Sequence, residues 1–191
     1  MEKTILVCIL AYLLGSISGA RVTALLYHTV NPTSSGSQNP GATNMYRIGG
    51  FKAGLLTFVL DLLKGLIAIW TAFKFELSAD QTGLVAVACC SGHIWPIFHK
   101  FKGGKAVACA LGCIFPVASG VASSLLVIWV ITMFLFHYAS LASICAVLAC
   151  PVLLFAAGSD YSITYSVLSL LIVWRHRNNI KRLLNGQEDK F

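Results

Sequence analysis

Three short polar segments of this chain carry residue types that bind anions. The first, residues 31–52, combines small hydroxyl and amide side chains with glycines and includes Arg47. Backbone N–H groups in such a loop can converge on an anion, and an arginine adds a bidentate phosphate donor. The segment predicts a phosphate cradle, although a simple connector between helices has the same composition. It lacks the G-x-x-x-x-G-K-[ST] pattern of nucleotide-hydrolysing loops.

The second polar segment ends on Gly103, Gly104 and Lys105, directly before an apolar stretch. Paired glycines and a lysine at the start of a helix place N–H groups and an ammonium where a phosphate could bind. The alternative is a basic cytoplasmic loop that only follows the positive-inside rule, and it accounts for Lys100 and Lys102. Because it does not account for the Gly-Gly-Lys junction, the segment is a second candidate anion site.

The third polar segment, residues 175–184, is predicted to leave the last apolar stretch as an amphipathic helix. His176 and Asn179 are three residues apart, so they share one helical face and can point into a common site. Arg177 and Lys181 then face lipid headgroups. His176 is a candidate catalytic base, and an ordinary structural histidine is the alternative.

Two ionisable residues lie inside an apolar stretch. Asp61 and Lys64 are three residues apart, so they share one face of a helix and can form an ion pair. Ionisable side chains at membrane depth are expensive and mark functional positions by default. A buried pair that only fixes the orientation of the helix is the alternative.

The seven cysteines lie in apolar stretches without a C-x-x-C pair or a regular spacing. They are therefore predicted to pack as small apolar side chains. Cys109 and Cys113 share a helical face, but two thiols without a nearby Cys or His partner rarely bind a metal ion. We expect no metal site.

The elements that must position these segments follow from the composition. The chain has 191 residues, of which 57% are hydrophobic and 11% are charged, and its net charge is +7. No Asp, Glu, Lys or Arg occurs from Ala106 to Ser159. These values exclude a disordered protein, a nucleic-acid-binding domain and a soluble enzyme. The expected fold class is all-α, a polytopic helical bundle in a membrane, with one domain over residues 1–191.

The number of spans follows from their length and from the positions of the charges. A helix needs about 20 apolar residues to cross a membrane, and basic segments stay on the cytoplasmic side. If the basic segments at 100–105 and 175–182 are both cytoplasmic, an even number of spans separates them, and four of about 17 residues fit better than two of about 35. We therefore predict seven spans, with the N-terminus outside and the C-terminus in the cytoplasm. The first three spans are expected at residues 4–28, 53–73 and 82–99, and the later turns near 116–120, 137–140 and 158–160.

Six motifs occur in a characteristic order along the chain. They are Gly15-Ser16-Ile17-Ser18, Gly36-Ser37-Gln38-Asn39-Pro40-Gly41-Ala42-Thr43-Asn44, Asp61-x-x-Lys64-Gly65, Gly92-His93, Phe101-Lys102-Gly103-Gly104-Lys105 and Arg175-His176-Arg177-x-Asn179-Ile180. Together they resemble the bacterial acyl-phosphate:glycerol-3-phosphate acyltransferase family, and the resemblance covers essentially the whole chain. Two positions depart from the family pattern: Ala106 replaces a common glycine, and Asn178 replaces a common acidic residue.

The resemblance implies an integral membrane enzyme that moves a fatty acyl group from acyl phosphate to the 1-hydroxyl of glycerol 3-phosphate. The products would be lysophosphatidic acid and phosphate. The expected partners are these two substrates and the lipid bilayer, and we expect no cofactor, no nucleic acid and no obligate protein partner. The implied location is the bacterial plasma (inner) membrane, with a multi-pass chain and an active site that faces the cytoplasm.

The resemblance also implies roles for individual residues. The catalytic residues expected by similarity are Ser37, Arg47, Lys105, His176 and Asn179. The residues expected to bind substrate or phosphate are Asn39, Gly41, Thr43, Asn44, Gly103 and Gly104.

Two other classes of function are alternatives to this one. A lipid-phosphate phosphatase is suggested by Ser91-Gly92-His93, but the downstream aspartate of that pattern is missing. A small membrane transporter would spread ionisable residues along the bundle and show inverted repeats. Here the polar residues concentrate in three segments, and no repeat is visible.

Overall fold

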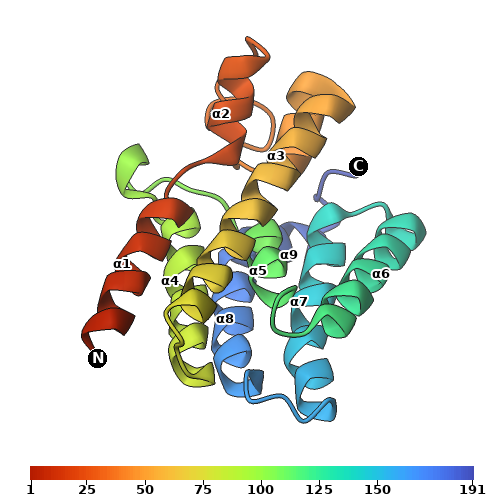
Figure 1. The fold of residues 1–191 in the computed structure, drawn as a ribbon. Coiled ribbons are helices and arrows are strands. Elements are labelled where there is room, and N and C mark those ends of the chain that lie inside the picture. The colour runs from red at the N-terminus through yellow and green to blue at the C-terminus, as the bar shows by residue number, and fades with distance from the viewer. The chain divides into compact units, whose positions relative to one another are not determined.

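All regular secondary structure in the chain is helical. The computed structural model describes all 191 residues and contains no strand (Figure 1). Four helical segments are long and apolar enough to cross a membrane: Glu2–Leu26, Ala42–Lys74, Ser119–Phe136 and Ala139–Ala156. A shorter apolar helix covers Ser162–Arg175. The predicted all-α membrane fold is confirmed, whereas the count of seven spans and their orientation stay predictions.

The chain divides into two compact units, Met1–Cys113 (unit 1) and Ile114–Phe191 (unit 2). The expectation of one domain over residues 1–191 stays a prediction. Unit 1 contains α1 (Glu2–Gly15), α2 (Gly19–Leu26), α3 (Ala42–Lys74), α4 (Ala79–Ile94), the short 3-10 turn η1 (Ile97–His99) and all but the last residue of α5 (Val107–Ile114). Unit 2 contains α6 (Ser119–Phe136), α7 (Ala139–Ala156), α8 (Ser162–Arg175) and α9 (Arg177–Leu184).

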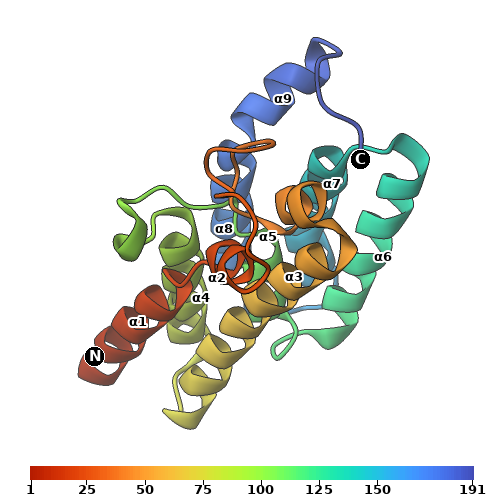
Figure 2. The same cartoon turned by 90° about the horizontal axis from the view of Figure 1, so that it is seen from above.

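In unit 1, α1 packs along α4, and α3 contacts α1, α2 and α4 (Figures 1 and 2). Glycines allow α1 and α4 to touch backbone to backbone. A Cβ atom on Gly15 would collide with the carbonyl group of Cys89, and one on Gly92 would collide with the carbonyl oxygen of Tyr12. Small residues at such contacts are typical of helices that pack in membranes.

The first predicted span, residues 4–28, is not one continuous helix. α1 ends at Gly15 and α2 begins at Gly19. At the break, the ammonium of Lys64 donates hydrogen bonds to the carbonyl oxygens of Gly15 (3.1 Å) and Ile17 (3.0 Å). A broken helix is tolerated in a membrane where such partners satisfy its backbone groups. The segment remains long and apolar enough to span a membrane, but the sequence did not reveal the break, because the compensating lysine belongs to another helix.

The second predicted span, residues 53–73, begins too late. α3 starts at Ala42, so the second half of the expected loop is helical. Gly50 interrupts this helix with φ +76°, a conformation that glycine adopts without steric cost. α3 therefore consists of a short first helix up to residue 49 and a long apolar helix after it. The third span, expected at 82–99, is α4, which starts three residues earlier and ends before Pro96.

In unit 2, α7 packs against α6, α8 and α9. The connections fall at residues 115–118, 137–138 and 157–161, where the turns were predicted. The stretch between the basic segments thus contains four helices, where four spans were predicted. However, the eight residues of α5 rise only about 12 Å, and the hydrocarbon core is about 30 Å thick. α5 alone is too short to be one of the predicted spans.

Candidate functional site

The first polar segment folds as a loop against the start of α3, and Asn44 holds its shape. Asn44 is 1% exposed. Its Nδ2 atom donates to the carbonyl oxygens of Pro32 (2.9 Å) and Ser35 (3.0 Å). Its Oδ1 atom accepts a hydrogen bond from the backbone N–H of Ser37 (2.9 Å), and Gly36 passes so close that a Cβ atom there would collide with Oδ1. Because both amide hydrogens of Asn44 bind the loop, its side chain shapes the loop.

The other predicted residues of this segment lie around the same helix start. Gly41 is the N-cap of α3, and Thr43 lies in the first turn. The N–H group of Gly41 donates to the carbonyl oxygen of Asn39 (2.9 Å). Ser37 in the loop and Arg47, further along α3, have exposed side chains. The N-terminus of a helix presents N–H groups and a partial positive charge, so this arrangement suits an anion.

The second polar segment wraps around the end of α4 at His93. The N–H group of Gly104 donates to the carbonyl oxygen of His93 (3.1 Å). A Cβ atom on Gly104 would collide with Nε2 of the His93 ring, and one on Gly103 would collide with the His93 carbonyl oxygen. The two glycines therefore allow close contact with His93, a role that the sequence did not reveal. Lys105 follows them, half-buried, two residues before α5.

The predicted ion pair of Asp61 and Lys64 is present in unit 1. Lys64 Nζ lies 2.9 Å from Asp61 Oδ1, and the two side chains are 5% and 2% exposed. His93 joins the pair, because its Nδ1 atom lies 2.6 Å from Lys64 Nζ and 3.5 Å from Asp61 Oδ1. Sequence spacing could not place His93 here, since α4 and α3 meet only in the folded chain.

The third polar segment places His176 at the junction of α8 and α9, where it is 2% exposed. Its Nδ1 atom lies 2.8 Å from the carbonyl oxygen of Ile172. A carbonyl oxygen can only accept, so Nδ1 carries the proton of the neutral ring. Nε2 is then the basic nitrogen. His176 can therefore act as a base only through Nε2.

Asn179 is held by an acidic residue of the C-terminal tail. Its Nδ2 atom donates to Glu188 Oε1 (2.6 Å), which also accepts from the hydroxyl of Ser140 (2.7 Å). Arg182 Nε donates to Glu188 Oε2 (2.7 Å). The sequence did not single out Glu188, because it follows α9 in an irregular tail without periodicity. His176 and Asn179 are buried, and Arg177 and Lys181 are exposed, so the burial agrees with the predicted division of this helix. That Arg177 and Lys181 face headgroups stays a prediction.

Glu188 makes the stability of unit 2 depend on pH. Burial raises the pKa of Glu188, but hydrogen bonds from Ser140, Asn179 and Arg182 outweigh it, so the pKa is lower than usual. A carboxylate with a lowered pKa stabilises the fold at pH values above the unfolded pKa of about 4.3. This stabilisation is lost as the pH falls through the lowered pKa of the folded protein.

We expect Glu188→Gln to lower the Tm in detergent at pH 7 by about 2–6 °C, because the carboxylate loses charge-assisted hydrogen bonds. The effect is limited because one partner, Arg182, is partly exposed. The difference from wild type should shrink as the pH falls below about 4. Thermal unfolding from pH 7 to pH 3.5 measures it, with Asp189→Asn as the control at the neighbouring carboxylate. A difference that stays constant over this range would contradict an ionised Glu188.

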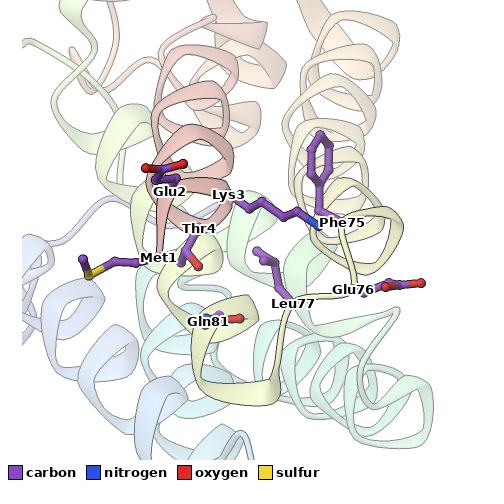
Figure 3. A pocket seen from close by; sticks show the side chains of 8 residues that line it. All are labelled: Met1, Glu2, Lys3, Thr4, Phe75, Glu76, Leu77 and Gln81. Carbon is purple, nitrogen blue, oxygen red and sulfur yellow. The ribbon is translucent and has the colours of Figure 1, made fainter.

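A surface hollow in unit 1 is not part of these three segments. It lies at the start of α1, beside the turn from α3 to α4 (Figure 3). None of the predicted site residues lines it. Its lining residues are Met1, Glu2, Lys3, Thr4, Phe75, Glu76, Leu77 and Gln81.

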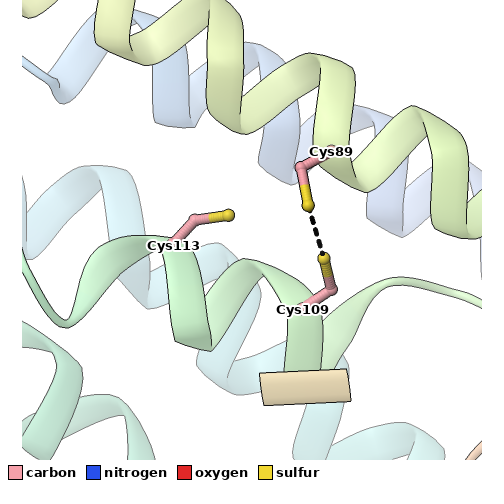
Figure 4. Close-up of side chains that lie close together, drawn as sticks. All are labelled: Cys89, Cys109 and Cys113. Carbon is pink, nitrogen blue, oxygen red and sulfur yellow. Dashed lines mark hydrogen bonds between the residues drawn. The ribbon is translucent and has the colours of Figure 1, made fainter. Parts of the chain in front are cut away.

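Three buried cysteines of α4 and α5 lie together. The sulfur atoms of Cys89 and Cys109 are 3.5 Å apart, and those two and that of Cys113 lie within 4.8 Å of one another (Figure 4). This spacing could hold a soft metal ion. Cys89 Sγ also lies 3.7 Å from the carbonyl oxygen of Lys64, to which only a protonated thiol can donate. Sequence spacing paired Cys109 with Cys113 but missed Cys89, which lies on another helix.

The comparisons with known proteins are consistent over the whole chain. The sequence model described as Glycerol-3-phosphate acyltransferase matches residues 5–186. The chain belongs to this family. The acyltransferase is 42% identical to a glycerol-3-phosphate acyltransferase of Photobacterium profundum over 186 residues, covering 97% of this chain and 92% of the relative. It is 44% identical to that of Pseudoalteromonas translucida over 185 residues, covering 97% and 91%.

Solved structures agree with the sequence relatives. The acyltransferase resembles the crystal structure of PlsY, an integral membrane glycerol 3-phosphate acyltransferase, in its glycerol 3-phosphate form. The TM-score is 0.92 at 42% identity, covering 98% of this chain and 95% of that chain. The lysophosphatidic acid form of PlsY gives a TM-score of 0.90 at 41% identity, with the same coverage. The resemblance to this enzyme family that the six motifs indicated is confirmed.

Proposed function

We propose that this acyltransferase transfers a fatty acyl group from acyl phosphate to the 1-hydroxyl of glycerol 3-phosphate, producing lysophosphatidic acid and phosphate. One observation carries the proposal: the match over 98% of the chain to an integral membrane enzyme crystallised in a glycerol 3-phosphate form and in a lysophosphatidic acid form. The acyl phosphate donor is the finer part of the proposal. It is supported by the two segments that are suited to bind anions, because both proposed substrates carry a phosphate group.

The reaction needs positioning more than a strong nucleophile, since an acyl phosphate is an activated mixed anhydride. The hydroxyl oxygen of glycerol 3-phosphate attacks the carbonyl carbon of the acyl phosphate. The bond from that carbon to the phosphate oxygen breaks, and phosphate leaves with the electron pair. The hydroxyl proton goes to a base, which is either His176 or the phosphate itself. No covalent acyl-enzyme is required.

We assign the phosphate groups to the two loops of unit 1. The first loop brings Ser37, Gly41 and Thr43 to the N-terminus of α3, where N–H groups favour an anion. Arg47 and Lys105 contribute the charges that bind phosphate and stabilise the transition state. Asn44 and Gly104 determine the shape of these loops, because the Asn44 amide and the Gly104 N–H already donate hydrogen bonds to carbonyl groups of the protein.

We assign the acceptor hydroxyl to the third segment. His176 carries its ring proton on Nδ1 through the bond to Ile172, so Nε2 can accept the hydroxyl proton. Asn179 orients the hydroxyl and is itself oriented by Glu188. The location follows the charges: we propose a multi-pass chain in the bacterial inner membrane, with all three segments on the cytoplasmic side.

A donor assay with purified protein in detergent tests the proposed reaction. Glycerol 3-phosphate is offered with palmitoyl phosphate or with palmitoyl-coenzyme A, and lysophosphatidic acid and phosphate are measured. We expect equal amounts of both products from palmitoyl phosphate. Product from the thioester but not from the acyl phosphate would overturn the donor assignment. Phosphate release without lysophosphatidic acid would indicate a hydrolase.

A further inference from the structure

Asp61, Lys64 and His93 form a buried cluster in unit 1, here called the charged centre. All three side chains are at most 7% exposed. Taking a full charge out of water costs several kcal/mol, and a buried pair is often no more stabilising than apolar residues of the same size. The proposed chemistry uses none of the three. Neither the stability of the fold nor the proposed reaction therefore explains why the chain carries these buried charges.

The contacts of the charged centre indicate which ring nitrogen of His93 is the acceptor. Lys64 Nζ has four neighbours within hydrogen-bond distance: Asp61 Oδ1, His93 Nδ1 and the carbonyl oxygens of Gly15 and Ile17. An ammonium has three protons and accepts nothing, so at 2.6 Å His93 Nδ1 must be the acceptor. The neutral ring then carries its proton on Nε2, the atom that lies against Gly104.

On one side, the charged centre reaches the second polar loop through His93. The His93 carbonyl oxygen accepts from the Gly104 N–H, and the ring occupies the space that a side chain at position 104 would need. The loop continues around the end of α4, where the Phe101 N–H donates to the carbonyl oxygen of Pro96 (3.0 Å). The next residue after Gly104 is Lys105. The position of the His93 ring therefore sets the path of the chain directly before Lys105.

On the other side, the charged centre reaches the break between α1 and α2. Lys64 binds the carbonyl oxygens of Gly15 and Ile17, and Asp61 Oδ1 accepts from the N–H of Gly19 (3.3 Å). Gly19 packs directly on Asp61, with room for no side chain. Three groups on two helices thus connect the break in the first span with the loop that carries Lys105.

We propose that Asp61, Lys64 and His93 are positioning residues for acyl transfer: they hold the Gly103–Lys105 loop against α4 so that the Lys105 ammonium lies where it binds phosphate. The proposal rests on the proposed function, because that function assigns phosphate to Lys105. A displacement of about 1 Å in such a group can cost about a hundredfold in rate. Removing the charges should therefore damage catalysis far more than folding.

The first test is the double variant Asp61→Asn/Lys64→Met, which removes both charges and leaves no unpaired buried charge. Because the carbonyl oxygens of Gly15 and Ile17 lose their donor, we expect its Tm in detergent to fall by up to about 10 °C while the protein stays folded. Its kcat/KM in the palmitoyl phosphate assay should fall by about 10- to 100-fold. The matched control is Thr23→Val/Thr57→Val, which removes a buried hydrogen bond of 3.0 Å between α2 and α3 away from the loop. The control should keep wild-type kinetics.

The second test asks whether the effect passes through Lys105. If the charged centre acts by holding Lys105, adding Asp61→Asn/Lys64→Met to Lys105→Ala should cost no more than about threefold beyond Lys105→Ala alone. The double variant should also change kcat and KM in the same pattern as Lys105→Ala. If the double variant instead damaged the fold in general, its loss of kcat/KM would multiply with the loss caused by Lys105→Ala. That result would overturn the proposal.

A third measurement does not depend on activity. Hydrogen exchange of the peptide segment 101–106 should be faster in the Asp61→Asn/Lys64→Met protein than in wild type, because the Gly104 N–H loses its fixed partner. Unchanged exchange together with wild-type kinetics would overturn the proposal. If wild type does not acylate glycerol 3-phosphate at all, the proposed function fails, while the exchange data still decide whether the charged centre holds the loop.

A second pair of variants decides the matter if the double variant does not fold. His93→Asn keeps an acceptor for Lys64 near the position of Nδ1, whereas His93→Ala keeps none. We expect His93→Asn to retain at least about tenfold more kcat/KM than His93→Ala and to exchange more slowly at residues 101–106. Equal kinetics and equal exchange in the two variants would overturn the proposal.

Discussion

Replacing His176 with alanine is expected to lower kcat by about 10²- to 10⁴-fold while the apparent KM for each substrate changes little. The reason is the tautomer: Ile172 holds the proton on Nδ1, so Nε2 is placed to accept the hydroxyl proton of glycerol 3-phosphate. The measurement is steady-state kinetics of the purified variant with palmitoyl phosphate, varying each substrate in turn.

The matched control is His137→Asn, which removes an exposed histidine of the same unit. His137 has φ +60°, and asparagine tolerates this conformation. The control should have wild-type kinetics. A loss of affinity in His176→Ala with kcat retained would remove the base assignment and leave the phosphate leaving group as the proton acceptor.

Replacing Lys105 or Arg47 with alanine is expected to lower kcat/KM by tenfold or more. A hydrogen bond to a charged group contributes about 1.5–3 kcal/mol, and each 1.4 kcal/mol corresponds to about tenfold. Because both residues are proposed to bind phosphate groups, kcat/KM should fall while each variant stays folded. The measurement combines kinetics with thermal unfolding of each variant.

Each of these variants has a control in its own segment. Lys102→Ala removes an exposed charge three residues before Lys105, and Lys52→Ala removes an exposed charge five residues after Arg47. Both control variants should have the kcat/KM of wild type if Lys102 and Lys52 only orient the chain in the membrane. Turnover like wild type in Lys105→Ala or Arg47→Ala would exclude that residue from the site.

The sequence was sufficient for the parts of the fold that depend on local pattern. The turns within the charge-free stretch and at its end were placed correctly, because glycine, proline and polar residues mark them regardless of packing. The break at Gly15 could not be predicted, because its carbonyl groups are satisfied by Lys64 from another helix. The helical start of α3 was missed for a related reason: Asn44 folds the polar loop back on the helix, and composition alone made the whole segment look irregular.

The candidate site shows the same limit. Spacing placed Asp61 beside Lys64 and Asn179 on the face of His176, because each pair lies on one helix. Spacing could not predict the contact of His93 with the ion pair or that of Glu188 with Asn179, because these contacts join separate elements. Gly103 and Gly104 were predicted to bind phosphate. In the structure both glycines pack against His93, a contact that sequence spacing cannot predict.

The break in the first span has an electrostatic consequence. The end of α1 carries a partial negative charge and the start of α2 a partial positive charge, each about half an elementary charge. Lys64 faces the first of these helix ends, and Asp61 faces the second. Together they form a ring of alternating charges with no net charge, which an apolar surrounding tolerates. A change that straightens the helix would therefore remove both helix ends and leave Asp61 and Lys64 without this part of their electrostatic compensation, although the ion pair between them would remain.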